Sequence, residues 1–188
     1  MSIETEKKYR LDAESKIAVL RALEETGAEH VGLDFEENVI YSSESLRQNG
    51  GVIRLRHVGG RTLLTYKRRV QGRSDVKEQI EHETEVADAD PIRAILKELD
   101  IRPALVYEKY RDTWKLRSVE VVLDELPFGS FMEIEGNLTG IKEAEIVLGI
   151  EDLETVHDTY PTMTAKLGTR VDDRTESRFK DGEADNRE

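Results

Sequence analysis

Alternating polar and apolar positions predict a chain built mainly of β-strands. Successive side chains of a strand point to opposite faces of the sheet, so residues two apart share a face. Runs with this alternation, separated by turn residues, predict eight strands over residues 3–10, 33–42, 52–58, 61–70, 76–86, 104–114, 118–126 and 130–137. Gly59 and Gly60 lie between two of these runs and predict a hairpin turn.

Helical spacing of apolar residues predicts helices between some of these strands. Asp12 is the expected N-cap of a helix over residues 13–26, and Gly27 is its expected stop. Asp90 followed by Pro91 predicts the start of a second helix, and further helices are expected over residues 139–148 and 162–167. Helices with an apolar stripe need a sheet face to bury against, so the pattern indicates an α+β fold.

One face of almost every predicted strand carries charge. The residues on these faces are Glu4, Glu6, Lys8 and Arg10; Arg54 and Arg56; Lys67 and Arg69; Glu81, Glu83 and Glu85; Lys109 and Arg111; Asp124; Glu133 and Glu135. Two arrangements can explain the pattern. The first is an antiparallel sheet whose charged face is in water. The second is a closed antiparallel β-barrel with a charged lumen and helices packed outside. The grouping of charges by sign within a strand favours the barrel.

The overall charge limits the possible ligands. The 188 residues carry a net charge of −12, which disfavours a general nucleic-acid binder or an anionic-membrane binder. The sequence has no cysteine, which excludes disulfides and thiolate metal sites. No apolar run approaches a membrane span and no signal peptide is recognisable, so we expect a cytoplasmic protein. The expected organisation is one domain over residues 1–171 and a polar, mobile tail over residues 172–188.

A charged lumen of this composition suits a polyphosphate and metal ions. The basic side chains can surround a polyanion, and arginine can bind phosphate oxygens through two nitrogens. The acidic side chains would repel phosphate but are suitable oxygen ligands for Mg²⁺ or Mn²⁺. The predicted phosphate-binding bases are Lys8, Arg54, Arg56, Lys67, Lys109 and Arg111, and the predicted metal ligands are Glu4, Glu6, Glu85, Asp124, Glu133 and Glu135. Glu83 is the alternative to Glu85.

This ordered set of charged residues resembles the CYTH superfamily, the triphosphate tunnel metalloenzymes. The resemblance runs from Glu4-x-Glu6-x-Lys8 to Glu133-x-Glu135 and extends more loosely to Lys166. It implies a tunnel of about eight antiparallel strands that binds a triphosphate together with Mg²⁺ or Mn²⁺. The family commonly has a further basic residue near the C-terminal end of the domain, and Lys166 is the candidate for that role in substrate binding.

The resemblance leaves three functions open. The first is metal-dependent hydrolysis of a triphosphate, such as ATP, inorganic triphosphate or thiamine triphosphate, with Lys67 as the candidate for orienting the attacking water. The second is cyclisation of ATP to cyclic AMP and pyrophosphate, as in class IV adenylate cyclases. The third is a non-enzymatic polyphosphate or nucleotide sensor. Residues 65–69 and the acidic residues 81–85 look more like those of the phosphatase members of the family, and this resemblance favours hydrolysis. The sequence does not distinguish a monomer from a homodimer.

Overall fold

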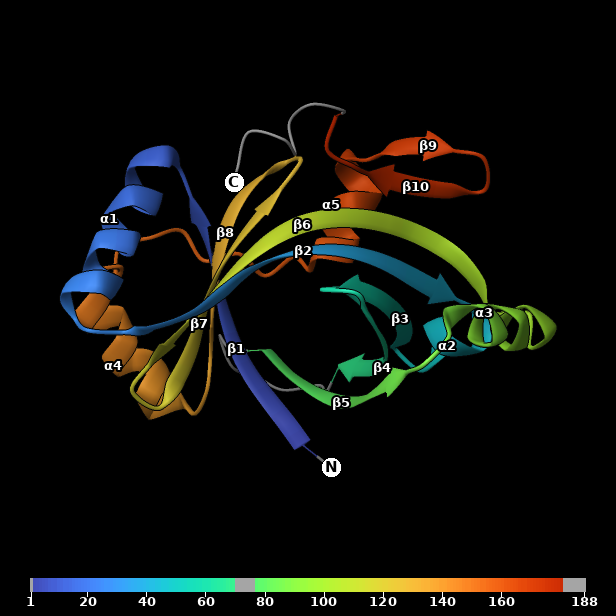
Figure 1. The fold of residues 1–188 in the computed structure, drawn as a ribbon, viewed down its shortest axis with the longest axis horizontal. Helices are drawn as coiled ribbons and strands as arrows, with labels where there is room; N and C mark the ends of the chain where they lie inside the picture. Colours follow the sequence, from blue (N-terminus) through green and yellow to red (C-terminus); the bar gives the residue numbers. More distant parts are fainter. Residues whose placement is uncertain (1, 70–76, 181–188) are drawn as a thin grey trace.

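Ten strands and five helices are present in residues 2–69 and 77–180, the part of the chain that the computed structural model describes (Figure 1). The elements follow one another in this order: β1 (Ser2–Leu11), α1 (Ala13–Glu25), β2 (Glu29–Ser42), α2 (Glu44–Gln48), β3 (Gly51–Val58), β4 (Arg61–Arg69), β5 (Lys77–Val86), α3 (Ala89–Glu98), β6 (Arg102–Leu116), β7 (Val119–Leu126), β8 (Gly129–Glu135), α4 (Leu138–Leu148), α5 (Tyr160–Leu167), β9 (Thr169–Val171) and β10 (Arg174–Ser177). None of the described helices is long and apolar enough to cross a membrane.

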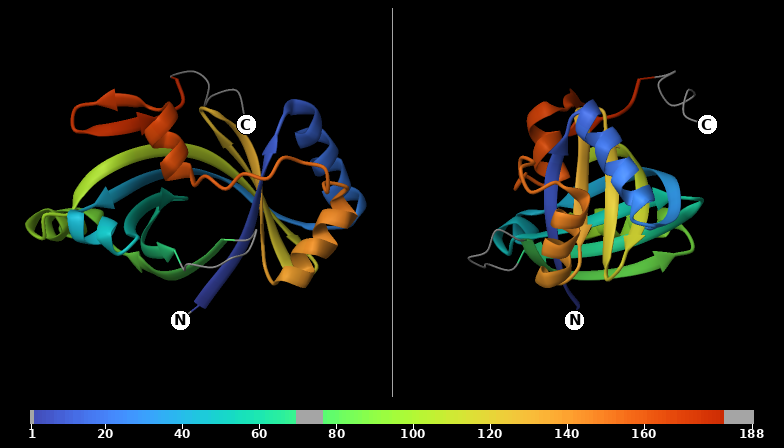
Figure 2. Two further views of the ribbon diagram at one scale, coloured as in Figure 1. Left: turned by 180° about the vertical axis from the view of Figure 1, so that it is seen from behind. Right: turned by 90° about the vertical axis from the view of Figure 1, so that its left-hand side faces the viewer.

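Eight of the strands follow one another around a tunnel. The order of antiparallel pairs is β2–β3–β4–β5–β1–β8–β7–β6, and β6 also pairs with β2. In Figures 1 and 2, β2 and β6 arch over β3, β4 and β5, while β1, β7 and β8 lie toward α1 and α4. The predicted α+β fold, with about eight antiparallel strands and helices outside, is therefore confirmed.

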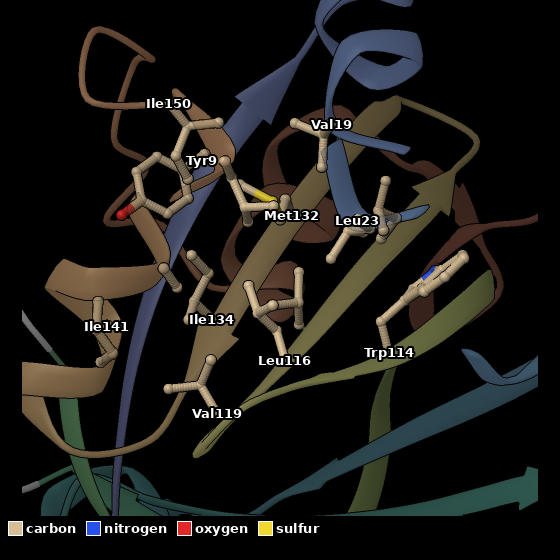
Figure 3. Close-up of a cluster of buried hydrophobic side chains, with 14 of the residues drawn as sticks. Tyr9, Val19, Leu23, Trp114, Leu116, Val119, Met132, Ile134, Ile141 and Ile150 are labelled. Atoms are coloured by element: carbon tan, nitrogen blue, oxygen red, sulfur yellow. The ribbon is translucent and has the colours of Figure 1, made fainter. Parts of the chain in front are cut away.

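The largest hydrophobic core lies on the outer face of the sheet, under α1 and α4 (Figure 3). Tyr9 of β1, Met132 and Ile134 of β8, Leu23 of α1 and Ile141 of α4 are all at most 2% exposed. Complete burial of a side chain as large as leucine contributes about 1.5–3 kcal/mol to folding. A second cluster packs Leu96 of α3 against the outer side of β2 and β3. Because both clusters lie outside the tunnel, the alternate residues of these strands face inward. A further cluster, which includes Ile40, Tyr107 and Tyr160, lies on the tunnel side.

Several local predictions agree with the structure, and others need correction. The backbone N–H of Ser15 donates to Asp12 Oδ1 at 2.8 Å, which confirms Asp12 as the N-cap of α1. Gly59 and Gly60 have φ of 53° and 76°, as their hairpin turn requires. Helix α3, however, is capped by Asp88 and begins before Asp90. Helix α2 was not predicted, because a five-residue helix shows too little periodicity to recognise.

The C-terminal region also differs from expectation over part of its length. Strand β10 pairs in parallel with β6, and β9 pairs with β10. The boundary expected after residue 171 thus falls between two paired strands, and residues 174–177 are part of the sheet rather than of a mobile tail. Short polar strands at a sheet edge lack the apolar alternation that identifies a strand in the sequence. Residues 181–188 of the predicted tail lie outside the described residues.

Candidate functional site

A cavity of about 290 Å³ lies inside the tunnel, and its wall is densely charged. All six bases predicted from the strand pattern line it, namely Lys8, Arg54, Arg56, Lys67, Lys109 and Arg111. Four acids line the same cavity: Glu6, Glu120, Glu133 and Glu135. The cavity therefore has an excess of basic groups inside a chain that is strongly acidic as a whole.

The alignment of neighbouring strands separates the charges along the tunnel. Glu6 of β1 lies opposite Glu135 of β8, and Glu120 of β7 lies opposite Glu135 on the other side. Three acids thus occupy one level of the wall. Two residues further along the strands, Lys8 lies opposite Glu133. The bases of β3 and β6 occupy the other part of the wall, so the cavity has an acidic side and a basic side. Lys67 of β4 lies near the acidic side, where its charge acts on Glu135.

Asp124 holds the basic side in place from behind the cavity wall. It is 1% exposed and accepts hydrogen bonds from Lys109, Arg111 and Tyr160, with the Arg111 Nε to Oδ1 distance at 2.7 Å. Arg111 also donates to Glu133 Oε2 at 2.8 Å. These donors engage both oxygens of Asp124, and unlike Glu133 it does not line the cavity, so the geometry favours a positioning role for it over the predicted role of metal ligand.

Comparisons with known proteins identify the family of this tunnel. The sequence profile of the CYTH domain matches residues 2–160, which is most of the chain. The chain belongs to the CYTH family. A search of curated protein sequences found no match, whereas many solved structures match.

Three solved structures illustrate how widely the fold of this CYTH domain occurs. The PH1012 protein from Pyrococcus horikoshii OT3 is 28% identical, with a TM-score of 0.68 over 80% of this chain and 94% of that one. An adenylate cyclase candidate from Vibrio parahaemolyticus is 20% identical, with a TM-score of 0.68 over 87% and 98%. An adenylyl cyclase candidate from Hippeastrum, described as revealing a dominant triphosphatase activity, is 16% identical, with a TM-score of 0.65 over 88% and 96%. At the last two identities the likeness shows the fold alone.

None of the acids of β5 whose side chains the structure describes lines the cavity of this CYTH domain, although Glu81 and Glu83 hold bases that do. Glu85 is exposed at the end of the strand and does not line the cavity. Glu83, the alternative, accepts hydrogen bonds from Arg54 at 3.3 Å and from Thr65 at 2.8 Å. Glu81 forms ion pairs with Arg54 at 3.5 Å and with Lys67. The alternation along β5 was correct, but the position along the strand was wrong for Glu85.

Two further predicted residues do not contribute to the described site. Lys166 projects from α5 with its side chain 61% exposed, and its Nζ lies 2.6 Å from Asp158 Oδ2. It does not line the cavity, so the structure does not bring Lys166 together with the other predicted bases. Glu4 belongs to β1, where its backbone lies opposite Gln79, but its side chain is outside the described residues.

Sequence reasoning missed Glu36, the most deeply buried acid of the network after Asp124. Its Oε2 lies 3.3 Å from Arg56 Nε and 3.5 Å from Lys109 Nζ. Burial alone would raise the pKa of Glu36, but attraction to Lys109, Arg111 and Arg56 lowers it to about 2. In the sequence, the polar residues Glu36 and Asn38 alternate with Val39, and this alternation in β2 could have indicated that Glu36 faces the tunnel.

Tyr160, the first residue of α5, is the second missed residue. Its ring lies in the cavity wall, with Lys8 Nζ 3.7 Å from the ring centroid, and its hydroxyl donates to Asp124 Oδ2 at 2.8 Å. The Thr159 side chain caps the helix and Pro161 follows at the first turn. This Thr-Tyr-Pro sequence is a helix-start signal that would have placed Tyr160 at the helix N-terminus, although not in the tunnel.

Crowding of positive charge changes the proton affinities of the basic side. Burial and the nearby charge of Arg111 together lower the pKa of Lys109 to about 8, against the attraction of Asp124 and Glu36. Burial and the charge of Arg54 also lower the pKa of Arg56. For Arg111, burial is outweighed by the contact with Asp124, and its pKa is raised. An anion in the cavity would therefore relieve repulsion among bases that the fold holds together.

The acidic side has the chemistry of a site for a hard cation. Burial raises the pKa of Glu135, and the charges of Glu120 and Glu6 raise it further. Carboxylate oxygens are preferred ligands of Mg²⁺ and Mn²⁺, and Mg²⁺ is often held by one or two carboxylates together with substrate phosphates. No group of three or more acidic or histidine side chains in the described part of the chain forms a complete metal cage. The acids present fit a cation that is coordinated partly by carboxylates and partly by the oxygens of a bound phosphate.

Proposed function

We propose that this CYTH domain binds the triphosphate group of a small molecule in its tunnel and hydrolyses it with Mg²⁺ or Mn²⁺. The observation that carries the proposal is the convergence of six bases from four different strands on one cavity. A solvated sheet face would not require them to meet. The family membership and the triphosphatase activity described for the Hippeastrum structure support the same reading.

The basic side is suited to grip phosphate oxygens. Arg54 is 8% exposed, and its Nη2 is held by Thr65 and Glu83. Its Nε has no hydrogen-bond partner in the described structure. A buried donor without a partner costs about 1–3 kcal/mol, so a phosphate oxygen beside Arg54 would remove that cost. Arg56 and Arg111 offer further donors, each oriented by a buried carboxylate.

The acidic side would hold the divalent cation through Glu6, Glu135 and Glu133. When bound, such a cation neutralises the charge that develops on the phosphate oxygens. Lys67 lies on the same side, since its charge lowers the pKa of Glu135 against the effect of the neighbouring acids. The Lys67 ammonium, positioned by its ion pair with Glu81, is our candidate for orienting the attacking water.

Cyclisation of ATP is the second candidate, because it would use the same grip on the triphosphate. The Vibrio and Hippeastrum structures are described as adenylate cyclase candidates. In that reaction the ribose 3′-hydroxyl replaces water as the nucleophile and attacks the α-phosphorus. Binding without turnover is the third possibility, since the residues that bind and the residues that react are the same.

Product analysis separates the three functions. Purified protein is incubated with ATP, inorganic triphosphate or thiamine triphosphate, each with Mg²⁺ and with Mn²⁺. Phosphate release supports hydrolysis, cyclic AMP with pyrophosphate supports cyclisation, and saturable binding without product supports a sensor. Absence of both binding and turnover with all three compounds would overturn the assignment of the tunnel.

A pair of arginine variants tests the site itself. Arg54→Met should lower kcat/KM, or the affinity if there is no turnover, by at least about tenfold, because a hydrogen bond to a charged group contributes about 1.5–3 kcal/mol. Arg10→Met is the matched control, since Arg10 has a half-exposed side chain, lies on the same strand face as Lys8 and does not line the cavity. Equal losses in the two variants would argue against the cavity as the binding site.

A further inference from the structure

A second basic pocket lies outside the tunnel. It has a volume of about 370 Å³ and is bounded by α3, the outer side of β2 and β6, and the β10 strand. Figure 1 shows α3 and the β9–β10 hairpin toward the same end of the long strand β6, well away from α1 and α4. Glu37, Val39 and Tyr41 of β2 line this pocket, whereas the alternating residue Ile40 lines the tunnel. The two cavities are therefore on opposite faces of β2.

Five bases and one acid line the outer pocket. The bases are Arg93, Lys97, Arg102, Arg174 and Arg178, which come from three separate parts of the chain. A cluster of five basic side chains is unusual on a chain with a net charge of −12. A surface hollow lined with this excess of bases is suited to an anionic ligand.

Two of the bases have a structural role at the back of the pocket. Arg178 donates to Glu37, Glu108 and Glu176, each at 2.6 Å. Arg174 donates to Glu176 at 2.5 Å. These contacts tie the β10 region to β2 and β6, so this wall of the pocket is held in position by the fold.

The other three bases are available to a ligand. Arg93 pairs with Asp90 at 2.8 Å and Arg102 with Asp100 at 3.1 Å, and both carboxylates are more than 80% exposed. Exposed pairs of this kind contribute little to stability, so an incoming anion can displace them. Arg93 Nη2 also lies 2.9 Å from His57 Nε2, so Lys97 and Arg102 are the freer of the three. Within the described residues, Lys97 has no ion pair within 4.0 Å.

The floor of the pocket adds apolar surface to this charge. Val39, Ile101 and Pro103 line it, beside the largely buried ring of Tyr41. Small-molecule sites typically have volumes of about 300–1,000 Å³ and combine apolar walls with a few placed polar groups. We propose that the outer pocket binds a phosphate-bearing small molecule with a flat aromatic ring, such as a nucleoside monophosphate, whose ring face would pack on the apolar floor. This inference does not depend on the function proposed for the tunnel.

The position of binding can be observed directly by NMR, because the chain has a mass of only 21.5 kDa. The full chain, labelled with ¹⁵N, is titrated with AMP in the presence of EDTA. We expect saturable shifts of the backbone amides of Lys97, Arg102 and Arg174, whatever occurs in the tunnel. Pyrophosphate should bind there more weakly, because it cannot cover the apolar floor.

Charge reversal provides the decisive comparison. The Lys97→Glu/Arg102→Glu double variant should raise the Kd for AMP at this site at least about tenfold, which corresponds to about 1.4 kcal/mol. Arg21→Glu/Lys142→Glu is the matched control, because it makes the same change in net charge at exposed positions on α1 and α4. All four side chains are exposed, so both variants should keep the wild-type amide spectrum.

Several results would overturn the proposal. AMP shifts confined to tunnel residues, or shifts that do not saturate, would show that the outer pocket is not a site. Equal Kd values in the two double variants would attribute binding to net charge alone. Pyrophosphate binding as tightly as AMP would refute the role given to the apolar floor.

Discussion

Lys109 is expected to take up a proton when a triphosphate enters the tunnel. Its Nζ lies 3.1 Å from Asp124 and 3.5 Å from Glu36, and its side chain is 2% exposed. Burial, together with repulsion from Arg111, sets the pKa of Lys109 at about 8 in the unliganded protein. A polyanion in the cavity favours the charged form of the lysine, so its pKa should rise on binding.

The size of the effect follows from that pKa. At pH 8 about half of the Lys109 side chains are neutral, so binding should take up about 0.5 proton, and at pH 6 the uptake should be close to zero. If the pKa in the complex is about 10 or higher, the affinity should fall about tenfold between pH 7 and pH 9. That fall corresponds to about 1.4 kcal/mol.

Isothermal titration calorimetry measures the uptake. Inorganic triphosphate is titrated with EDTA present at pH 8 and at pH 6, in two buffers of different ionisation enthalpy. The Lys109→Met variant should lose the uptake at pH 8, and Lys166→Met should retain it, because Lys166 lies outside the cavity. Subtracting the Lys109→Met value removes any proton exchanged by the triphosphate itself. Equal uptake by wild type and Lys109→Met would refute the reasoning.

Three further predictions concern the acids. Glu36→Gln should lower the unfolding free energy by about 3 kcal/mol at pH 6, because the pKa of Glu36 is lowered from 4.5 to about 2. This stabilisation is present above pH 4.5 and is lost as the pH falls through about 2. In urea denaturation, the difference in unfolding free energy between wild type and variant should therefore shrink by more than half at about pH 3. Asp124→Asn should cost about 3–5 kcal/mol, since it leaves buried cations without their partner, and a loss below about 1 kcal/mol in the same assay would contradict that role. Glu135→Gln should raise the melting temperature without metal, by removing repulsion, and lower metal-dependent turnover, while the exposed control Glu85→Gln should change neither.

Much of the fold and the basic half of the site could be predicted because strand alternation decides which face a residue joins. Arg54 and Arg56 share a face whatever their neighbours are, and the same holds for Lys109 and Arg111. Apolar residues such as Leu55 and Val121 then require the opposite face to pack on helices. Together these two constraints bring the bases into one lumen.

The acidic half could be predicted less well, because it depends on how strands align rather than on which face they show. Glu81, Glu83 and Glu85 are equivalent by alternation, and only the pairing of Lys67 with Glu81 places Glu85 beyond the cavity. Asp124 looks like a metal ligand until Lys109, Arg111 and Tyr160 are seen around it. The position of α5 depends on tertiary packing, which has no counterpart in strand periodicity.

The place of β1 in the ring has a consequence for how the protein folds. Strands β2, β3, β4 and β5 form one meander, in which each strand pairs with the next in sequence, and β6, β7 and β8 form a second. Strand β1 instead pairs with β5 and with β8, where Lys8 meets Glu133 from the far part of the chain. Contacts between residues so distant in sequence form slowly, because a long loop must be ordered first. We therefore expect the two meanders to form early in refolding. The tunnel should acquire its ligand affinity last, when β2 pairs with β6 and β1 joins β5 to β8.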